Sequence, residues 1–258
     1  MIKIAVINEF DGLTDSDIRP VVKALNFQVK KHFAPVWGVE AELYMPKPGI
    51  APQPEHWQLV ILDNAHQAGI YGYHELTSHG QPLGKVFAGT DLRDGSSWTV
   101  TASHEVLEML IDPSINLSAF VPQKKGPGVL YGYEVCDACQ ADEFGYTIRV
   151  GKQDVLVSDF VYPGWFEDFH RRGTQYDYQK KVTQPFQLLK GGYISVYDIG
   201  KHHHRWTIKA AKLKGKNFRV REDPGTRRAQ RRLPKKQWRK SITPGIRVGK
   251  IKNGKIAA

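Results

Sequence analysis

The sequence predicts an α+β fold, in which residues 1–200 form one domain around a mixed sheet and residues 201–258 form a basic extension. Short apolar runs typical of strands alternate with two amphipathic helical patterns, and their order favours an α+β layer arrangement. The apolar periodicity fades after residue 200, where basic side chains interleave with aromatic ones. The composition of the 258 residues, 41% hydrophobic and 24% charged, is that of an ordinary globular protein.

The elements of the predicted domain follow from local patterns. The predicted strands are residues 2–7, 41–45, 59–62, 69–76 and 85–88, the fourth being an edge strand. A helix is predicted after the first strand, starting near Asp15 and Asp17, because apolar residues recur at three- and four-residue spacing. These residues are Ile18, Val21, Val22, Leu25, Val29 and Phe33. His74 and His79 flank the edge strand and are interpreted as surface histidines, with substrate binding as the alternative. Residues 129–200 are expected to hold short strands and irregular structure.

A second helix is predicted to begin near Trp98 and to end at Asp112, which a proline follows. At 100° per residue, one side of this helix is apolar. Its apolar residues are Val106, Leu107, Leu110 and Ile111. His104 and Glu108 lie beside that apolar side. Glu105 lies farther round the helix, where we expect it to point toward solvent.

The spacing His-Glu-x-x-Glu in this helix is related to a known metal-binding pattern. In H-E-x-x-H, two histidines one turn apart bind zinc and the glutamate acts as general base. A carboxylate oxygen is also a zinc ligand. We therefore predict that His104 and Glu108 bind a metal ion and that Glu105 is the base. The alternative is the solvated polar side of an ordinary surface helix.

A zinc site needs at least three protein ligands, so a third is expected outside this pair. The acidic segment farther along the chain offers Glu134 and Asp137, and Asp112 is a further candidate. Cys136 and Cys139 have the spacing of a zinc knuckle, but the chain contains no other cysteine. We interpret them as two small buried thiols. A structural site that combines both thiols with the histidine of the helix stays open as an alternative.

The H-E-x-x-E motif at residues 104–108, followed by E-x-x-D-x-C at residues 134–139, resembles the zincin-like metallopeptidases. The similarity is to a bacterial and phage branch and, more distantly, to the plant exordium-like proteins. It implies a zincin-like domain with one zinc ion, held by the histidine and second glutamate of the first motif and by Glu134 or Asp137. Glu105 would be the general base for hydrolysis of a peptide bond. A second carboxylate ligand lowers the effective charge of the metal, which predicts slow activity or none.

Charge is distributed unevenly along the chain, whose net charge is +11. Residues 201–258 hold 20 Lys and Arg against Glu222 and Asp223, whereas the rest of the chain holds 17 basic and 24 acidic residues. Basic doublets of this kind bind nucleic-acid phosphates or an acidic protein surface. The candidate binding residues are Arg227, Arg228, Arg231, Arg232, Lys235 and Lys236. The alternative is a solvated basic tail without a partner.

Two functions are compatible with these patterns. The first is a zinc-dependent metallopeptidase that acts on a peptide or protein. The second is a non-enzymatic phage virion or assembly protein that keeps the fold and binds nucleic acid or partner subunits through residues 201–258. The first residues lack the features of a signal peptide, and no apolar run is long enough to cross a bilayer. We therefore expect a cytoplasmic location, or a virion if the protein is phage-encoded, and no membrane partner.

Overall fold

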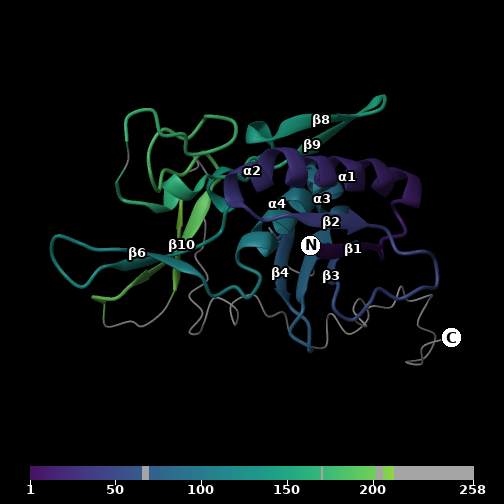
Figure 1. Ribbon diagram of the computed structural model, residues 1–258, viewed down its shortest axis with the longest axis horizontal. Coiled ribbons are helices and arrows are strands. Elements are labelled where there is room, and N and C mark those ends of the chain that lie inside the picture. The colour runs from purple at the N-terminus through teal and green to yellow at the C-terminus, as the bar shows by residue number, and fades with distance from the viewer. Residues whose placement is uncertain (66–69, 170, 202–205, 212–258) are drawn as a thin grey trace.

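The computed structural model describes residues 1–65, 70–169, 171–201 and 206–211 (Figure 1). Its first part, up to residue 111, is a sheet with helices on one face, and its second part is rich in strands. The strands of the first part are β1 (Ile2–Asn8), β2 (Ala41–Tyr44), β3 (Trp57–Leu62), β4 (Gly72–Leu76) and β5 (Pro82–Phe87). Its helices are α1 (Asp15–Gln28), the π-helical turn η1 (Val29–Phe33), α2 (Ala34–Trp37), α3 (Ala88–Asp94) and α4 (Trp98–Ile111). The α+β class is therefore as predicted.

The five-stranded sheet has the order β2-β1-β3-β5-β4. Strands β1, β2, β3 and β5 are parallel, whereas β4 at the edge is antiparallel to β5. Strands in the middle of such a sheet are buried on both faces and consist of nearly continuous apolar residues, which describes β1 and β3. The mixed sheet and the position of β4 at its edge confirm two predictions from the sequence.

Helix α1 covers one face of this sheet. Thr14 and Asp17 form a capping box at its start, in which the Thr14 backbone N–H donates to Asp17 Oδ2 at 2.7 Å. Its buried residues, Ile18, Val21, Val22, Ala24, Leu25 and Gln28, belong to the side that meets the sheet and the second part of the chain. The apolar spacing predicted as far as Phe33 continues through η1 into α2. Gly38, with φ of 70°, ends that helix in the left-handed region.

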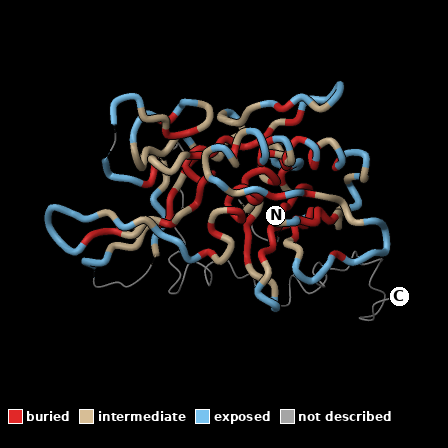
Figure 2. The backbone as a smooth tube through the Cα atoms, viewed as in Figure 1, coloured by how far each residue is buried: buried red, intermediate tan, exposed pale blue. Residues whose placement is uncertain are grey.

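Helix α4 lies in the middle of the molecule, where Figure 2 shows most of the backbone as buried. Its bounds agree with the prediction, but its surroundings do not. Strands β4 and β5 pack against one side and the hairpin strand β9 (Gln153–Val157) against another. Eleven of its residues are buried, and they include His104, Glu105 and Glu108. The sequence predicted a helix with a solvated side, whereas the structure buries both its apolar and its polar residues.

The second part of the chain contributes an antiparallel sheet of order β11-β10-β7-β6. Its strands are β6 (Ser118–Val121), β7 (Val129–Gly132), β10 (Tyr193–Asp198) and β11 (Thr207–Ala210). A separate hairpin of β8 (Tyr146–Val150) and β9 packs against α1 and α4. The short 3-10 turns are η2 (Asp137–Cys139), η3 (Asp142–Phe144) and η4 (Pro163–Phe166). Because β11 pairs with β10, this sheet continues past residue 200, the domain boundary predicted from composition.

A buried hydrogen-bond network joins α1, α4 and the segment after β9. The Ser103 hydroxyl donates to Gln28 Oε1 at 2.7 Å and accepts from the Ser158 backbone N–H at 3.0 Å. Gln28 Nε2 in turn donates to the Ser158 carbonyl at 2.9 Å. Each polar group of this network thus finds a partner, and the network fixes α4 in position.

Among the described residues, no helix is both long enough and apolar enough to cross a membrane.

Candidate metal centre

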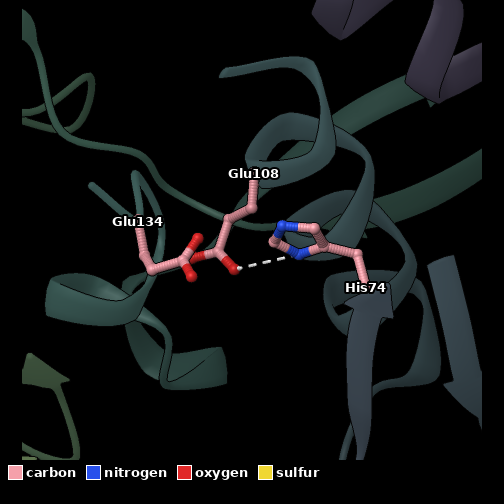
Figure 3. Close-up of side chains that lie close together, drawn as sticks. All are labelled: His74, Glu108 and Glu134. Atoms are coloured by element: carbon pink, nitrogen blue, oxygen red, sulfur yellow. Dashed lines mark ion pairs between the residues drawn. The ribbon is translucent and has the colours of Figure 1, made fainter. Parts of the chain in front are cut away.

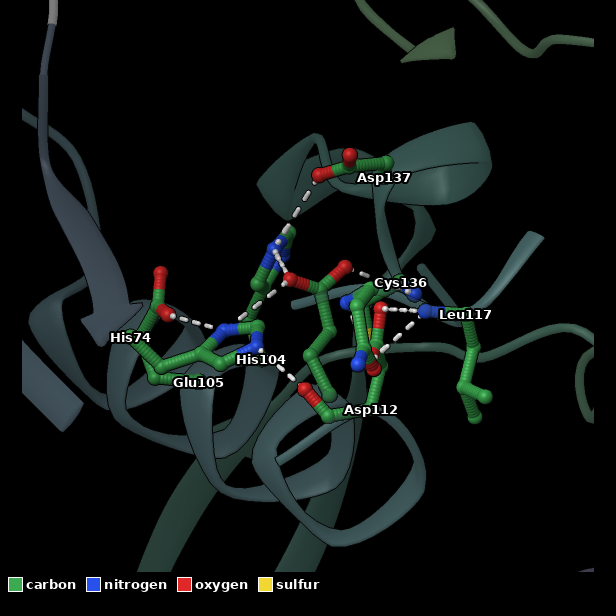
Figure 4. A network of polar contacts seen from close by, with 9 residues as sticks. His74, His104, Glu105, Asp112, Leu117, Cys136 and Asp137 are labelled. Carbon is green, nitrogen blue, oxygen red and sulfur yellow. Dashed lines mark hydrogen bonds and ion pairs between the residues drawn. The ribbon is translucent and has the colours of Figure 1, made fainter. Parts of the chain in front are cut away.

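Helix α4 and two other segments bring acidic and histidine side chains together in one cluster (Figure 4). Strand β4 contributes one, α4 contributes three, and the loop after β7 together with η2 contributes two. They are His74, His104, Glu105, Glu108, Glu134 and Asp137. None is more than 7% exposed. Burial of so many ionisable groups is costly unless their charges are balanced, so this cluster is a candidate binding site for a cation.

The first group within the cluster consists of His104, Glu108 and Asp137. His104 Nε2 lies 3.1 Å from Glu108 Oε2 and 3.3 Å from Asp137 Oδ1. The first contact joins two residues one helical turn apart. The second joins α4 to η2, which lies far away in the sequence. The structure therefore places together two of the residues predicted from the helix and one of the two downstream acidic residues.

The second group consists of His74, Glu108 and Glu134 (Figure 3). The His74 side chain comes from β4 and points toward the Glu108 carboxylate, with 3.9 Å between Nδ1 and Oε2. The Glu134 carboxylate approaches Glu108 from the opposite side (Figure 3). Glu134 therefore lies with a different histidine from the one predicted. Glu108 is the residue that the two groups share.

The electrostatic environment of Glu108 reflects its neighbours. Burial and then the carboxylate of Asp137 raise the pKa of Glu108 to about 8, although His104 acts in the opposite direction. Burial by itself lowers the pKa of His104, but the carboxylates of Glu108 and Asp137 raise that pKa well above its ordinary value. Ionising Glu108 is therefore unfavourable unless positive charge lies nearby. Glu108 Oε1 accepts a hydrogen bond from the Cys136 backbone N–H at 3.2 Å, which leaves Oε2 directed at the histidines.

Glu105 was predicted to point toward solvent, but the structure buries it, with only 4% of the residue exposed. It lies against β4 and β5, where two glycines provide the space. A Cβ atom at Gly72 would lie 2.7 Å from Glu105 Oε1, and one at Gly84 would lie 3.6 Å from its Cβ. Glu105 Oε2 lies 3.6 Å from His74 Nδ1 and makes no hydrogen bond within the described part of the chain. The prediction was wrong because the helix pattern cannot show that a sheet covers this side.

Asp112, the other candidate for a third ligand, has a structural role. Its carboxylate accepts backbone hydrogen bonds from Asn116 at 2.9 Å and from Leu117 at 3.1 Å, and so holds the turn after α4. Its backbone carbonyl lies 3.0 Å from His74 Nε2 (Figure 4). Asp112 therefore orients His74, and it belongs to neither of the two groups of residues that can hold a metal ion.

Cys136 and Cys139 are free thiols that are fully buried. Burial, together with nearby carboxylates, raises the pKa of both thiols well above the ordinary value. A zinc ligand must be a thiolate, so this environment favours two neutral buried side chains, as interpreted from the sequence. Neither thiol belongs to the groups of residues that can hold a metal ion.

The donor geometry suits a metal ion. Ligand atoms bound to one zinc ion at about 2.1 Å in a tetrahedron lie roughly 3.4 Å from one another. The contacts of 3.1 and 3.3 Å made by His104 Nε2 match that separation. The atoms of each group lie within 4.8 Å of one another. Buried groups of His, Glu and Asp that can hold a metal ion are therefore present.

His74 is a further site residue whose predicted surroundings were wrong. It was expected at the surface, but it is completely buried and faces α4. Its position inside an edge strand that precedes the motif helix was the available signal, because an edge strand next to that helix points alternate side chains at it.

The candidate nucleic-acid or partner-binding residues lie outside the described residues. They are Arg227, Arg228, Arg231, Arg232, Lys235 and Lys236.

Comparison of the chain with protein-family models, with curated proteins and with solved structures finds no match.

Proposed function

We propose that the protein is a zincin-like metallopeptidase whose zinc ion is held by His104, Glu108 and Asp137. The observation that carries this proposal is the approach of His104 Nε2 to within 3.1 and 3.3 Å of two carboxylate oxygens, with all three residues at least nine-tenths buried. One imidazole and two carboxylates are donors that zinc accepts. The resemblance of the H-E-x-x-E and E-x-x-D-x-C motifs supports the same assignment.

Each part of the proposed site would have its own role in peptide hydrolysis. A zinc ion held there would act as a Lewis acid toward a peptide carbonyl and toward water. Glu105, the neighbour of His104 on the same helix, would accept and pass on the proton of that water. An extended peptide would pair with β4, which lies at the edge of the sheet. With two carboxylates among three ligands, a bound zinc ion would be a weaker Lewis acid, and we expect slow turnover.

The first test is elemental mass spectrometry on purified protein and on the His104→Ala variant. The proposal expects near-stoichiometric zinc in the wild type and its loss in the variant. The second test is Glu105→Gln, which should abolish peptide hydrolysis and keep the zinc. Wild-type protein without metal, after purification free of chelators, would contradict the metal site. Unchanged hydrolysis by Glu105→Gln would contradict the assignment of the base.

One observation favours a second candidate function. His104 and Glu105 are only 7% and 4% exposed, which leaves little surface for a substrate to reach. In this alternative, the metal stabilises the fold of a non-enzymatic phage virion or assembly protein. Its contact with nucleic acid or partner subunits would come from the 20 basic residues of 201–258. Salt-sensitive DNA binding that is lost on removal of residues 212–258, with Glu105→Gln neutral, would support this function.

A further inference from the structure

Glu108 lies between two histidines that approach it from different elements. Its Oε2 atom is 3.1 Å from His104 Nε2 and 3.9 Å from His74 Nδ1. One histidine belongs to the same helix and the other to β4. Each has its own acidic companion, Asp137 in one case and Glu134 in the other. Glu108 is thus the common member of two complete donor sets.

The hydrogen bond between His74 and Asp112 determines which nitrogen of His74 can bind a cation. A backbone carbonyl only accepts hydrogen bonds, so the contact of 3.0 Å places the proton on His74 Nε2. In its neutral form, the ring therefore presents the lone pair of Nδ1 to Glu105 and Glu108, whose oxygens are 3.6 and 3.9 Å away. This arrangement, in which one nitrogen binds metal while the other donates to a carbonyl, is usual for metal-bound histidine.

A single ion does not account for both histidines. Two atoms bound to the same ion at about 2.1 Å can be no more than roughly 4.2 Å apart, even on opposite sides of it. The histidines fall into different groups, although each group admits atoms up to 4.8 Å apart. An ion held by His104 and Asp137 is therefore too far from His74 to bind it as well.

Charge balance favours two cations over one. Four carboxylates of the cluster, those of Glu105, Glu108, Glu134 and Asp137, are at most 4% exposed. When all four are ionised, two divalent ions neutralise them, whereas one ion balances only two of the four charges. Glu105 Oε2 also supports the second position, because it is buried, lies beside His74 and makes no hydrogen bond within the described residues.

We propose that this cluster is a dinuclear metal centre in which Glu108 bridges two divalent cations. The first cation is the one assigned above to His104 and Asp137. The second is held by His74 Nδ1 and Glu134. The inference deepens the proposed function, on which its first ion rests, whereas the second ion depends in addition on His74 and Glu134. Carboxylate-bridged metal pairs about 3.5–4 Å apart are typical of hydrolytic two-metal sites. In such a centre the proposed base, Glu105, would lie beside the second ion, because its Oε2 is 3.6 Å from His74 Nδ1.

Zinc stoichiometry measured by elemental mass spectrometry tests the second ion. His202, His203 and His204 should first be changed to alanine in the full-length chain, because a histidine run binds metal adventitiously. In that background we expect two zinc ions per chain, and one in each of His74→Ala and His104→Ala. Exposed His79 provides the matched control, since His79→Ala should keep both ions. Far-UV circular dichroism and a cooperative thermal transition would show that each variant is folded.

The outcomes separate this inference from the proposed function. Suppose that the protein without a substitution in the cluster binds one zinc ion, which His74→Ala retains and His104→Ala loses. This result would support the single zinc site of the proposed metallopeptidase and overturn the second ion. The absence of zinc would overturn both proposals. Electron paramagnetic resonance of the protein loaded with Mn²⁺ avoids any dependence on variants. An exchange-coupled multiline spectrum would support the bridged pair, whereas an isolated six-line spectrum at saturation would overturn it.

Discussion

Replacement of Asp91 by asparagine is expected to stabilise the protein above pH 7 and to change it little near pH 4. Asp91 lies in α3 and is completely buried. Its Oδ1 accepts a hydrogen bond from the Thr101 hydroxyl at 3.2 Å, and its Oδ2 has no hydrogen-bond partner within the described residues. Burial, and to a lesser extent nearby carboxylates, raise the pKa of Asp91 from 3.8 to about 7. An asparagine has the same shape and can still accept the bond from Thr101.

The size of the effect follows from this pKa shift. Between pH 3.8 and about 7, the unfolded chain ionises Asp91 while the folded protein keeps it protonated. The folded state therefore loses stability as the pH rises, by about 1.4 kcal/mol per pH unit. Above about pH 7 the loss is complete, and the accumulated difference is roughly 4 kcal/mol. The asparagine side chain does not ionise in either state, so Asp91→Asn should be more stable than the wild type by this amount at pH 8.

Urea unfolding of both proteins at one-unit intervals from pH 4 to pH 8, in the presence of a chelator, measures this difference. Comparing variant with wild type at each pH cancels the contributions of other titrating groups. Asp154→Asn, at an exposed position of β9, is the matched control and should show no rise with pH. A difference that stays constant with pH, or a less stable Asp91→Asn protein at pH 8, would refute the reasoning.

Two further substitutions test the packing around the candidate centre. Gly192→Ala should destabilise the protein by about 1–3 kcal/mol in urea unfolding, because its Cβ would collide with the Ala138 carbonyl in η2. Gly164→Ala should cost less, since its Cβ would meet only a methyl group at 3.2 Å, and an equal loss in both would contradict this account. Ser103→Ala should cost about 1–3 kcal/mol, because it leaves two buried polar groups without their hydrogen bonds. Ser118→Ala, at an exposed position, should be nearly neutral, and a similarly small loss for Ser103→Ala would argue against the network.

Local patterns predicted much of the first part of the fold. The apolar runs of β1 and β3, the start of α1 and the bounds of α4 all depend on residues close together in sequence. Helix α3 was missed, since its sequence Ala-Gly-Thr-Asp-Leu-Arg-Asp has no apolar face long enough to show a period. The four-stranded sheet was predicted only as short strands. Its pairings join residues far apart, and a sequence pattern carries no signal for them.

The candidate site was predictable to the same limited extent. His104 and Glu108 share a helix, so their proximity follows from helical geometry. Asp137 and Glu134 were named as alternatives, and only the folded chain shows that they accompany different histidines. The burial of Glu105 could not be foreseen, because it depends on how closely β4 approaches α4. The edge-strand position of His74 was a signal for its place in the site, but that position alone does not give the distance to the helix. Two glycines of β4 and β5 permit that approach, but a glycine in a strand is equally typical of a bulge or a tight bend.

The hydrogen bonds around Ser103 have a consequence for the order in which the protein folds. Residues 1–111 contain a complete five-stranded sheet with its helices, which gives the appearance of a unit able to fold alone. However, Ser103 and Gln28, which are hydrogen-bonded to each other, each make a further hydrogen bond with the backbone of Ser158. During synthesis, the first part of the chain therefore leaves the ribosome with its central helix exposed on one side. Stable folding must wait until the β8–β9 hairpin and residue 158 have also emerged, so the two parts are expected to fold as one cooperative unit.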